Sequence, residues 1–339
     1  MDDWKNSKTP WDSVVDMGNL TNLIYDYAKN WKINELDGLS EFFENENGNT
    51  SLCSKDKTVL LSLKERYPEG KILKFFTNSA DLQCVIGENP HKKRYTLVFR
   101  GSESVWDWLY DLMVLKTTLF DNVSVHSGFH KQLMNNNTYH KIGTFMQKLI
   151  DKNPDWSWYI SGHSLGGALA TLAGFLYSRH FYNQRFTVIS LASPRVGNSH
   201  FRDCFNNQNN LRHFRVCNYR DCVTALPMFW YCHVGRNLYF DTKKNTWFDY
   251  GFNAPFSYYF YNCWNPYDHS CSLYIKCLQH KQNQLLEAAK LLERARERST
   301  APELSNNSNS NEENKDIVKS YNIRLIEDED GIRKETASI

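Results

Sequence analysis

The sequence has almost no excess of charge of either sign. Forty lysine and arginine residues face 38 aspartate and glutamate residues, which gives a formal net charge of +2 over 339 residues. Proteins that bind nucleic acids or anionic membranes through electrostatics present strongly basic surfaces. This balance gives no support to either kind of partner, and we expect no nucleic acid as a ligand.

Long apolar runs are also missing. Residues 1–17, MDDWKNSKTPWDSVVDM, are polar and acidic and contain no apolar stretch of the kind found in secretion signals. The most apolar stretch, residues 156–177, is interrupted by polar residues and glycines, so we expect no transmembrane segment. By default this predicts an intracellular soluble protein, and the sequence does not identify its compartment.

The nine cysteines follow no recognised pairing pattern. Their odd number, in a chain expected to stay in the cell, predicts reduced thiols. Some of them lie near histidines, but without the C-x2-C spacing that is typical of zinc sites. We therefore predict buried thiols along a strand, with no metal and no other cofactor. The residues in question are His213, Cys217, Cys222, Cys232 and His233.

The sequence has clear apolar periodicity, with strand-like and helix-like spacings, and this pattern predicts an α/β protein. Three short strands before residue 100 are separated by polar stretches, which indicates an antiparallel meander. After Gly101, strands and helices alternate, as in a mostly parallel sheet flanked by helices. The expected strands are 72–76, 82–87, 95–99, 156–160, 186–192, 211–217 and 234–241; the expected helices are 11–32, 127–152, 165–181, 198–206 and about 270–298.

Composition divides the chain into three parts. Residues 1–69 form a predicted helical region that packs on the main body. Residues 70–298 form that body and include the long last helix. From Ser299 the chain is rich in Ser, Asn, Glu and Asp. Such a segment buries too little apolar surface to offset the entropy of ordering, so 299–339 is predicted to be a disordered tail.

Residues 162–166, Gly-His-Ser-Leu-Gly, match the pattern G-x-S-x-G. Alone the pattern is weak, because chance produces it in roughly one chain in ten of this length. A nucleophile elbow also requires a strand before the serine, a helix after it and small residues two positions away on each side. The sequence has all of these around Ser164. The alternative is an ordinary serine that caps a closely packed helix.

Six segments, in order, resemble the lipase class 3 family, an α/β-hydrolase family that includes secreted fungal triacylglycerol lipases. They are LVFRGS (97–102), VHSGF (125–129), GHSLGGALA (162–170), SPRVGN (193–198), RDCVTALP (220–227) and DHSCSLYI (268–275). The resemblance covers roughly residues 70–275. It implies the α/β-hydrolase fold, a nucleophile elbow at Gly162–Gly166, and a serine hydrolase that acts on lipid esters.

A catalytic triad is expected in the chain order Ser…Asp…His. Ser164 is the nucleophile. Asp221 is the acid that orients the base, because it follows an expected strand and because the family motif points to it. His269 is the base, as the resemblance implies. The fungal enzymes carry a tyrosine three residues after the base, whereas here Tyr274 comes five residues after it.

Two groups are expected to stabilise the oxyanion. The backbone N–H of Leu165 follows from elbow geometry, because it begins the helix after the nucleophile. The backbone N–H of Ser102, together with its hydroxyl, is implied by the resemblance.

Other residues compete for these roles. Asp203 and Asp268 are alternative acids, and His233 is the main alternative base. His126, at the start of a helix, is expected to be a structural residue that forms hydrogen bonds. His163 lies inside the elbow, where its side chain points away from that of Ser164, and we interpret it as a packing residue.

Two aromatic segments are candidates for the lid and the acyl pocket. The segment 104–113 directly follows Ser102 and has an amphipathic helical pattern. In the fungal relatives the matching segment is a lid, whereas a fixed helix packed on the body is the alternative. The second segment is 255–264, PFSYYFYNCW. The lid and acyl-pocket candidates are Trp106, Trp108, Leu109 and Tyr110.

The sequence therefore predicts an enzyme that cleaves carboxylic esters of lipids, an acylglycerol lipase or esterase, through an acyl-serine intermediate. Lipid esters are the expected partner, with contact to a lipid surface as a further expectation. A phospholipase A1 acting on membrane lipids is the first alternative. A non-catalytic binding protein with a hydrolase fold is the second.

Overall fold

The structure is a computed structural model that describes residues 4–5, 7–30, 40–41, 70–102, 115–252 and 266–300. Contacts between Cα atoms divide the chain into two units, Met1–Gln279 and His280–Ile339. The first unit contains the sheet and its helices. In the second, the described residues continue the last helix, α8 (Cys271–Thr300). The predicted divisions after residues 69 and 298 stay predictions, and residues 301–339 of the predicted tail lie outside the described residues.

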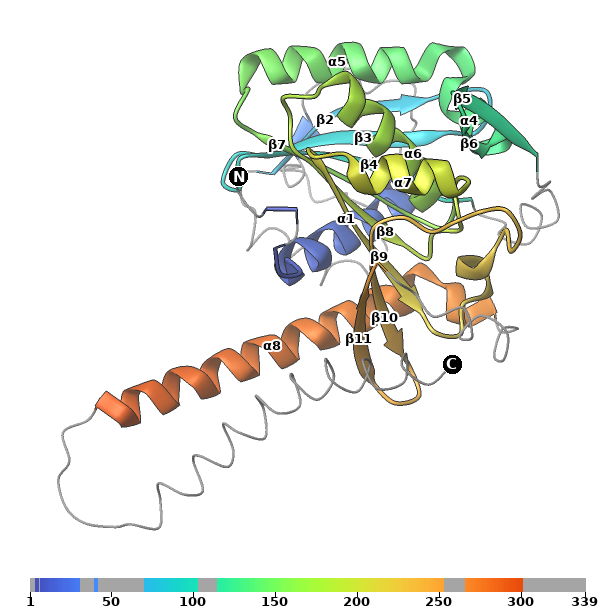
Figure 1. Ribbon diagram of the computed structural model, residues 1–339. Helices are drawn as coiled ribbons and strands as arrows, with labels where there is room; N and C mark the ends of the chain where they lie inside the picture. Colours follow the sequence, from blue (N-terminus) through green and yellow to red (C-terminus); the bar gives the residue numbers. More distant parts are fainter. Residues whose placement is uncertain are drawn as a thin grey trace, which may run out of the picture. The chain divides into compact units, whose positions relative to one another are not determined.

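Nine of the described strands form one sheet (Figure 1). Its central strands β4, β7, β8, β9 and β10 are parallel, while β1 to β4 and the pair β10–β11 are antiparallel. The mostly parallel sheet and the antiparallel meander are therefore confirmed. In spatial order the strands are β1 (Ser40–Glu41), β2 (Lys71–Thr77), β3 (Gln83–Asn89), β4 (Arg94–Phe99), β7 (Ser157–His163), β8 (Phe186–Leu191), β9 (Leu211–Asn218), β10 (Arg236–Asp241) and β11 (Thr246–Gly251).

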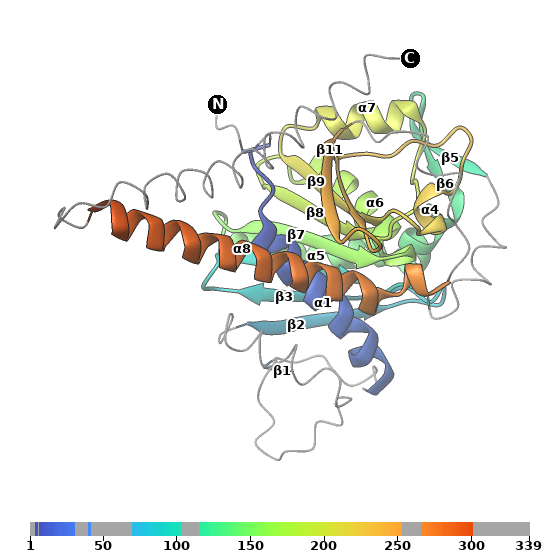
Figure 2. The same ribbon diagram turned by 90° about the horizontal axis from the view of Figure 1, so that it is seen from below.

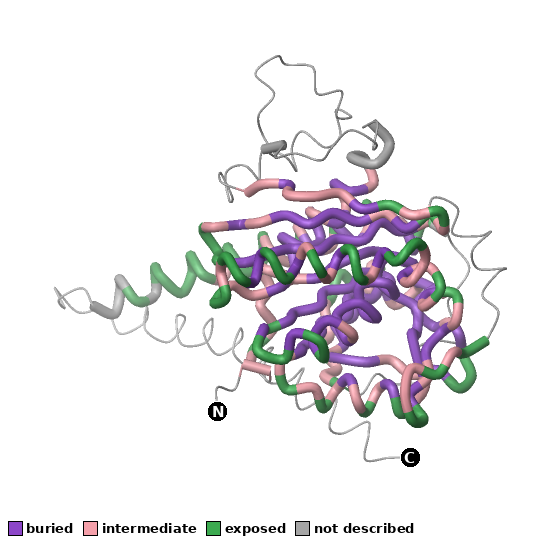
Figure 3. Tube along the Cα trace, turned by 90° about the horizontal axis from the view of Figure 1, so that it is seen from above, coloured by how far each residue is buried: buried purple, intermediate pink, exposed green. Residues whose placement is uncertain are grey.

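Three of the central strands are buried along their whole length. Every residue of β4, β8 and β9 is buried, and Figure 3 shows the buried segments concentrated in the middle of the sheet. Parallel strands with helices on both faces are shielded from water on both sides, which is why β8 reads FTVISL rather than alternating polar and apolar residues.

Helices cover both faces of the sheet (Figures 1 and 2). On one face, α4 (Ser127–Met134), α5 (Thr138–Lys152), α6 (Leu165–His180) and α7 (Ser199–Asn207) contribute to the larger hydrophobic core. On the other face, α1 (Trp11–Asn30) and the first turns of α8 contribute to a second core. This arrangement is that of an α/β-hydrolase fold, as predicted. Among the described residues, no helix combines the length and apolar composition that a membrane span requires.

The single helix predicted over 127–152 is wrong, because two helices occupy this stretch. A short 3-10 turn at Asn135–Asn137 separates α4 from α5, and Asn136 and Asn137 adopt positive φ angles of 51° and 59°. Asparagine tolerates this left-handed conformation better than most residues, so the asparagine run interrupts the helix. Neither β11 nor the small separate hairpin of β5 (Lys116–Phe120) and β6 (Val123–His126) was predicted from the sequence.

Candidate active site

Ser164 is the single residue between the end of β7 and the start of α6. Its φ of 58° and ψ of −124° lie in a region that residues with a Cβ rarely adopt. Two backbone hydrogen bonds hold it there: its N–H donates to the Leu191 carbonyl (2.9 Å), and its carbonyl accepts from the N–H of Ala168 (3.1 Å). The turn therefore maintains a strained serine at the edge where the parallel strands end.

The two glycines of the elbow are required by close backbone contacts. A Cβ on Gly162 would lie 2.3 Å from the Gly166 carbonyl carbon. A Cβ on Gly166 would lie 2.5 Å from the Phe99 carbonyl oxygen. Both distances are shorter than real Cβ contacts, so neither position admits a side chain. The elbow thus packs directly on the end of β4.

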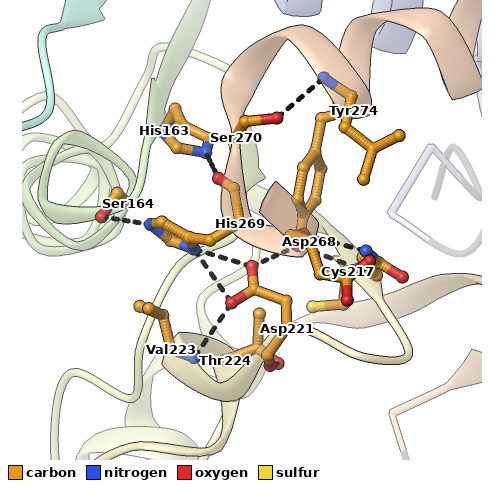
Figure 4. A network of polar contacts seen from close by, with 12 residues as sticks. His163, Ser164, Cys217, Asp221, Val223, Thr224, Asp268, His269, Ser270 and Tyr274 are labelled. Atoms are coloured by element: carbon orange, nitrogen blue, oxygen red, sulfur yellow. Dashed lines mark hydrogen bonds and ion pairs between the residues drawn. The ribbon is translucent and has the colours of Figure 1, made fainter. Parts of the chain in front are cut away.

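Three side chains form a continuous hydrogen-bonded chain at this turn (Figure 4). Ser164 Oγ lies 2.8 Å from His269 Nε2, and His269 Nδ1 lies 2.9 and 2.8 Å from the two carboxylate oxygens of Asp221. Since a carboxylate only accepts, His269 Nδ1 carries the proton and its Nε2 accepts from the Ser164 hydroxyl. Ser164 does not cap α6 with its side chain, so the alternative of a simple helix cap does not hold.

The structure brings these residues together from distant parts of the chain. Asp221 lies three residues beyond β9 and caps a short 3-10 helix, η3 (Cys222–Ala225). His269 ends another 3-10 helix, η5 (Pro266–His269), just before α8. Ser164, Asp221 and His269 are all buried. Water competes little with hydrogen bonds in such a place, which strengthens them.

Asp221 has two further hydrogen-bond partners that fix its carboxylate. The backbone N–H of Val223 donates to Oδ1 (2.9 Å), and the hydroxyl of Tyr274 donates to Oδ2 (2.7 Å). Tyr274 in turn accepts from the backbone N–H of Asn218 (2.9 Å). Burial, and then the nearby negative charge of Asp221, raise the pKa of Tyr274 well above its usual value, so it stays a donor. The sequence analysis noted only the unusual spacing of this tyrosine and missed its contact with Asp221.

His163 is more than a packing residue. Its Nε2 lies 2.8 Å from the backbone carbonyl of His269, and its Nδ1 lies 3.0 Å from the hydroxyl of Tyr25 on α1. Burial, followed by the neighbouring His269, lowers the pKa of His163 well below 6.5. The neutral ring therefore donates from Nε2 to the carbonyl and accepts from Tyr25 at Nδ1. This chain of contacts ties the backbone of His269 to the N-terminal helix.

The same tyrosine contacts the segment that carries Ser102. The backbone of Gly101 hydrogen-bonds to the Tyr25 hydroxyl. A Cβ on Gly101 would lie 2.5 Å from the carbonyl oxygen of His163, so this backbone passes directly beside the elbow. Ser102 is the next residue and is half-buried. Leu165 begins α6, whose first turn leaves N–H groups without acceptors inside the helix. The oxyanion roles of Ser102 and Leu165 stay predictions.

We expect Tyr25→Phe to lower the turnover of a soluble ester about tenfold, with KM nearly unchanged. The substitution removes the donor to His163 and the partner of Gly101, and thereby loosens the backbone of His269 without touching a substrate. Steady-state kinetics and their pH profile measure the effect. Tyr182→Phe is the matched control, because Tyr182 is 72% exposed. Equal turnover in the wild type and Tyr25→Phe would contradict the assignment.

The competing residues lie elsewhere or have other partners. Asp203 pairs with Arg202 on the surface of α7. The carboxylate of Asp268 lies 3.4 Å from Arg220. His126 accepts a hydrogen bond from the backbone N–H of Gly128 and caps α4, as its structural interpretation predicted.

His233 is not the histidine that contacts Ser164. Burial, then Arg215 and Arg195, lower its pKa well below 6.5. Its sequence neighbours in the cysteine-rich stretch also have other partners. His213 hydrogen-bonds to Ser190, with its pKa lowered to about 3 by burial and by Arg215. Cys217 accepts from Arg215. The prediction of buried thiols along a strand holds for Cys217 on β9, whereas Cys222 and Cys232 are half-buried and lie outside the named strands.

The predicted lid segment 104–113, with Trp106, Trp108, Leu109 and Tyr110, lies outside the described residues. The same holds for the aromatic segment 255–264. Their end points are described: Ser102 and Leu115 on either side of the first gap, Phe252 and Pro266 on either side of the second.

A strained serine at an elbow, hydrogen-bonded to a histidine and through it to an aspartate at the ends of parallel strands, defines the α/β-hydrolase class. The family model Lipase (class 3) matches residues 96–230. Through this stretch the chain is similar to the lipase class 3 family.

Individual relatives show a similar likeness. "Phospholipase A1-II 3" of Oryza sativa subsp. indica is 30% identical over 188 residues, which cover 47% of this chain and 45% of the relative. "Lipase" of Rhizopus niveus is 29% identical over 198 residues, or 55% of this chain and 48% of the relative. The chain thus spans about half the length of the curated relatives it matches.

Solved structures share the fold. The crystal structure of a lipase from Rhizopus microsporus var. chinensis superposes with a TM-score of 0.54 at 22% identity, covering 69% of this chain and 76% of the other. At this identity the likeness supports the fold alone.

Proposed function

We propose that the protein is a serine hydrolase that cleaves carboxylic esters of lipids through an acyl-serine intermediate. The hydrogen-bonded chain from Ser164 through His269 to Asp221 carries this proposal. Acyl transfer needs a nucleophile, a base that takes its proton and a group that orients the base, and these three residues have the required geometry.

In the first half of the proposed reaction, Ser164 Oγ attacks the ester carbonyl carbon while His269 Nε2 accepts the proton of the Ser164 hydroxyl. Asp221 keeps the proton on Nδ1 and stabilises the imidazolium that forms. The protonated His269 then donates its proton to the leaving alcohol oxygen, and the C–O bond breaks. The acyl group remains on Ser164.

In the second half, water replaces the alcohol. His269 accepts a proton from that water, whose oxygen attacks the acyl carbon, and then returns a proton to Ser164 Oγ as the carboxylic acid leaves. In both halves the negative carbonyl oxygen would be held by the backbone N–H groups of Leu165 and Ser102. Preorganised donors of this kind usually contribute about 10²–10³ in turnover each.

Two lipid substrates are supported by named relatives. Acylglycerols are suggested by relatives called lipase, such as that of Rhizopus niveus. Phospholipids are the second candidate, because several of the relatives that the chain matches are named phospholipase A1. Contact with a lipid surface is part of either proposal.

A panel of substrates tests the function. We expect a fluorophosphonate probe to label the wild type and not Ser164→Ala. p-Nitrophenyl esters from C2 to C16, a triacylglycerol and a phosphatidylcholine then rank the substrates, with Ser164→Ala as the blank. Release of the sn-1 acyl chain from phosphatidylcholine as the fastest reaction would favour phospholipase A1. A folded wild type that neither takes the label nor hydrolyses any ester would instead indicate a non-catalytic binding protein.

A further inference from the structure

A cluster of apolar side chains projects into solvent where two distant segments meet. Phe229 is 62% exposed, Trp230 75%, Met228 38% and Leu115 56%. The neighbouring Lys116 is exposed as well. We call these five residues the aromatic tip. Contiguous exposed apolar groups on a protein surface usually mark a site of interaction.

Contacts hold the two segments of the aromatic tip together. The hydroxyl of Tyr231, which is itself buried, donates to the carbonyl of Leu115 at 3.2 Å. The Lys116 ammonium lies 4.9 Å from the ring centroid of Tyr231 and 6.0 Å from that of Trp230. The rings of Phe229 and Trp230 lie 6.0 Å apart. These contacts place the two segments side by side.

The backbone under the aromatic tip is hydrogen-bonded to Arg195 and has an unfavourable conformation at Trp230. The buried guanidinium of Arg195 donates to the carbonyls of Ala225 (2.6 Å), Pro227 (2.8 Å) and Met228 (3.3 Å). Trp230 has a φ of 60°, an unfavourable conformation for a bulky residue. Strain of this kind persists only where the surroundings enforce it. The strained residue here is Trp230, whose side chain is nevertheless three-quarters exposed to solvent.

Two carbonyl groups of the aromatic tip, those of Leu115 and Met228, are paired within the protein. The carbonyl of Leu115 accepts from Tyr231 and from the backbone N–H of Ser127 (2.9 Å). The carbonyl of Met228 accepts from Arg195. A protein partner would need polar groups to pair with, about one hydrogen bond per 100–200 Å² of interface. A lipid surface offers few partners for backbone N–H and C=O groups, so the groups that enter it must already be hydrogen-bonded within the protein.

We propose that the aromatic tip is a docking site for a phospholipid surface, an inference that rests on the proposed action on lipid esters. Tryptophan and phenylalanine suit the boundary between headgroups and acyl chains. Lys116 lies beside them and attracts anionic headgroups.

The aromatic tip also lies close along the chain to the proposed catalytic residues. Asp221 caps η3, which ends at Ala225, and Met228 follows three residues later. Leu115 is the first described residue after Ser102. A lipid surface bound at the aromatic tip would therefore be bound by residues that follow Asp221 and Ser102 in the chain.

Vesicle binding tests the proposal in a chain that cannot hydrolyse the lipid. The full-length Ser164→Ala protein is sedimented with sucrose-loaded phosphatidylcholine vesicles, with and without phosphatidylserine. We expect Phe229→Ser with Trp230→Ser, added to Ser164→Ala, to lower the partition coefficient tenfold or more, to about a tenth or less. Lys116→Gln is expected to weaken binding only to the vesicles that contain phosphatidylserine. Tyr182→Ser, which removes another exposed ring, is the matched control.

Several outcomes overturn the proposal. One is equal vesicle binding with and without the two serine substitutions, in proteins that unfold at the same temperature. Another is an equal loss of binding in Tyr182→Ser. Self-association in the absence of lipid that the two serine substitutions abolish would assign the aromatic tip to a second copy of the chain. Hydrolysis of a soluble ester by the wild type is measured separately, so that a failure of the proposed function is told apart from a failure of docking.

Discussion

Replacing Ser164 with alanine is expected to lower the turnover of a soluble ester by about 10⁶. The hydroxyl that attacks the carbonyl is lost, and the remaining groups of the site have no nucleophile to activate. p-Nitrophenyl butyrate hydrolysis by purified protein measures the loss, and circular dichroism checks that the fold is kept. A folded variant with more than a hundredth of the wild-type turnover would contradict the assignment of Ser164.

Two variants at position 164 together measure the backbone strain of the elbow. Ser164→Ala and Ser164→Gly both remove the hydroxyl and its 2.8 Å hydrogen bond to His269. Only glycine adopts a φ of 58° and a ψ of −124° without cost. We expect the glycine variant to be inactive but more stable than the alanine variant by about 1 kcal/mol, since strain of ~1–3 kcal/mol is relieved and part of it is offset by chain entropy.

Denaturant unfolding of the two variants measures this difference in the free energy of unfolding. Equal stability, or a less stable glycine variant, would mean that the backbone at Ser164 is not strained in solution.

The elbow could be predicted from sequence because its requirements are local. Gly162 and Gly166 lie two residues from Ser164, and the strand and the helix on either side have clear apolar patterns. The sheet was predictable for a similar reason, since buried parallel strands form short apolar runs. The helix predicted over 127–152 failed where three consecutive asparagines follow Met134, because apolar spacing does not register a residue that tolerates a left-handed conformation.

The hydrogen bonds of Tyr25 and Tyr274 around the proposed base could not be predicted from local sequence patterns. Tyr25 lies 138 residues before His163, and Tyr274 lies 53 residues after Asp221. Neither pair follows from periodicity or from a short motif, because each contact exists only once the chain has folded. The unusual distance of Tyr274 from His269 was visible as a departure from the fungal spacing, and the structure explains it: from the first turns of α8 the tyrosine still reaches the Asp221 carboxylate.

Changing Asp221 to asparagine is expected to lower turnover by about 10⁴. The carboxylate accepts from His269 Nδ1 and so leaves Nε2 free to take the proton of Ser164. An asparagine keeps its carbonyl oxygen facing the backbone N–H of Val223, which can only donate, so its NH2 group takes the position next to Tyr274 and can donate to Nδ1 instead. That tautomer places a proton on Nε2 and removes the base.

Asp268→Asn is the control for this prediction, since Asp268 precedes His269 in the sequence but pairs with Arg220. Steady-state kinetics of both variants between pH 5 and pH 10 distinguish the two acids. We expect Asp268→Asn to retain most of the wild-type turnover at neutral pH, and Asp221→Asn to recover part of its loss at high pH, where hydroxide replaces the missing base. An Asp268→Asn variant as impaired as Asp221→Asn would show that the acid of the site has been misassigned.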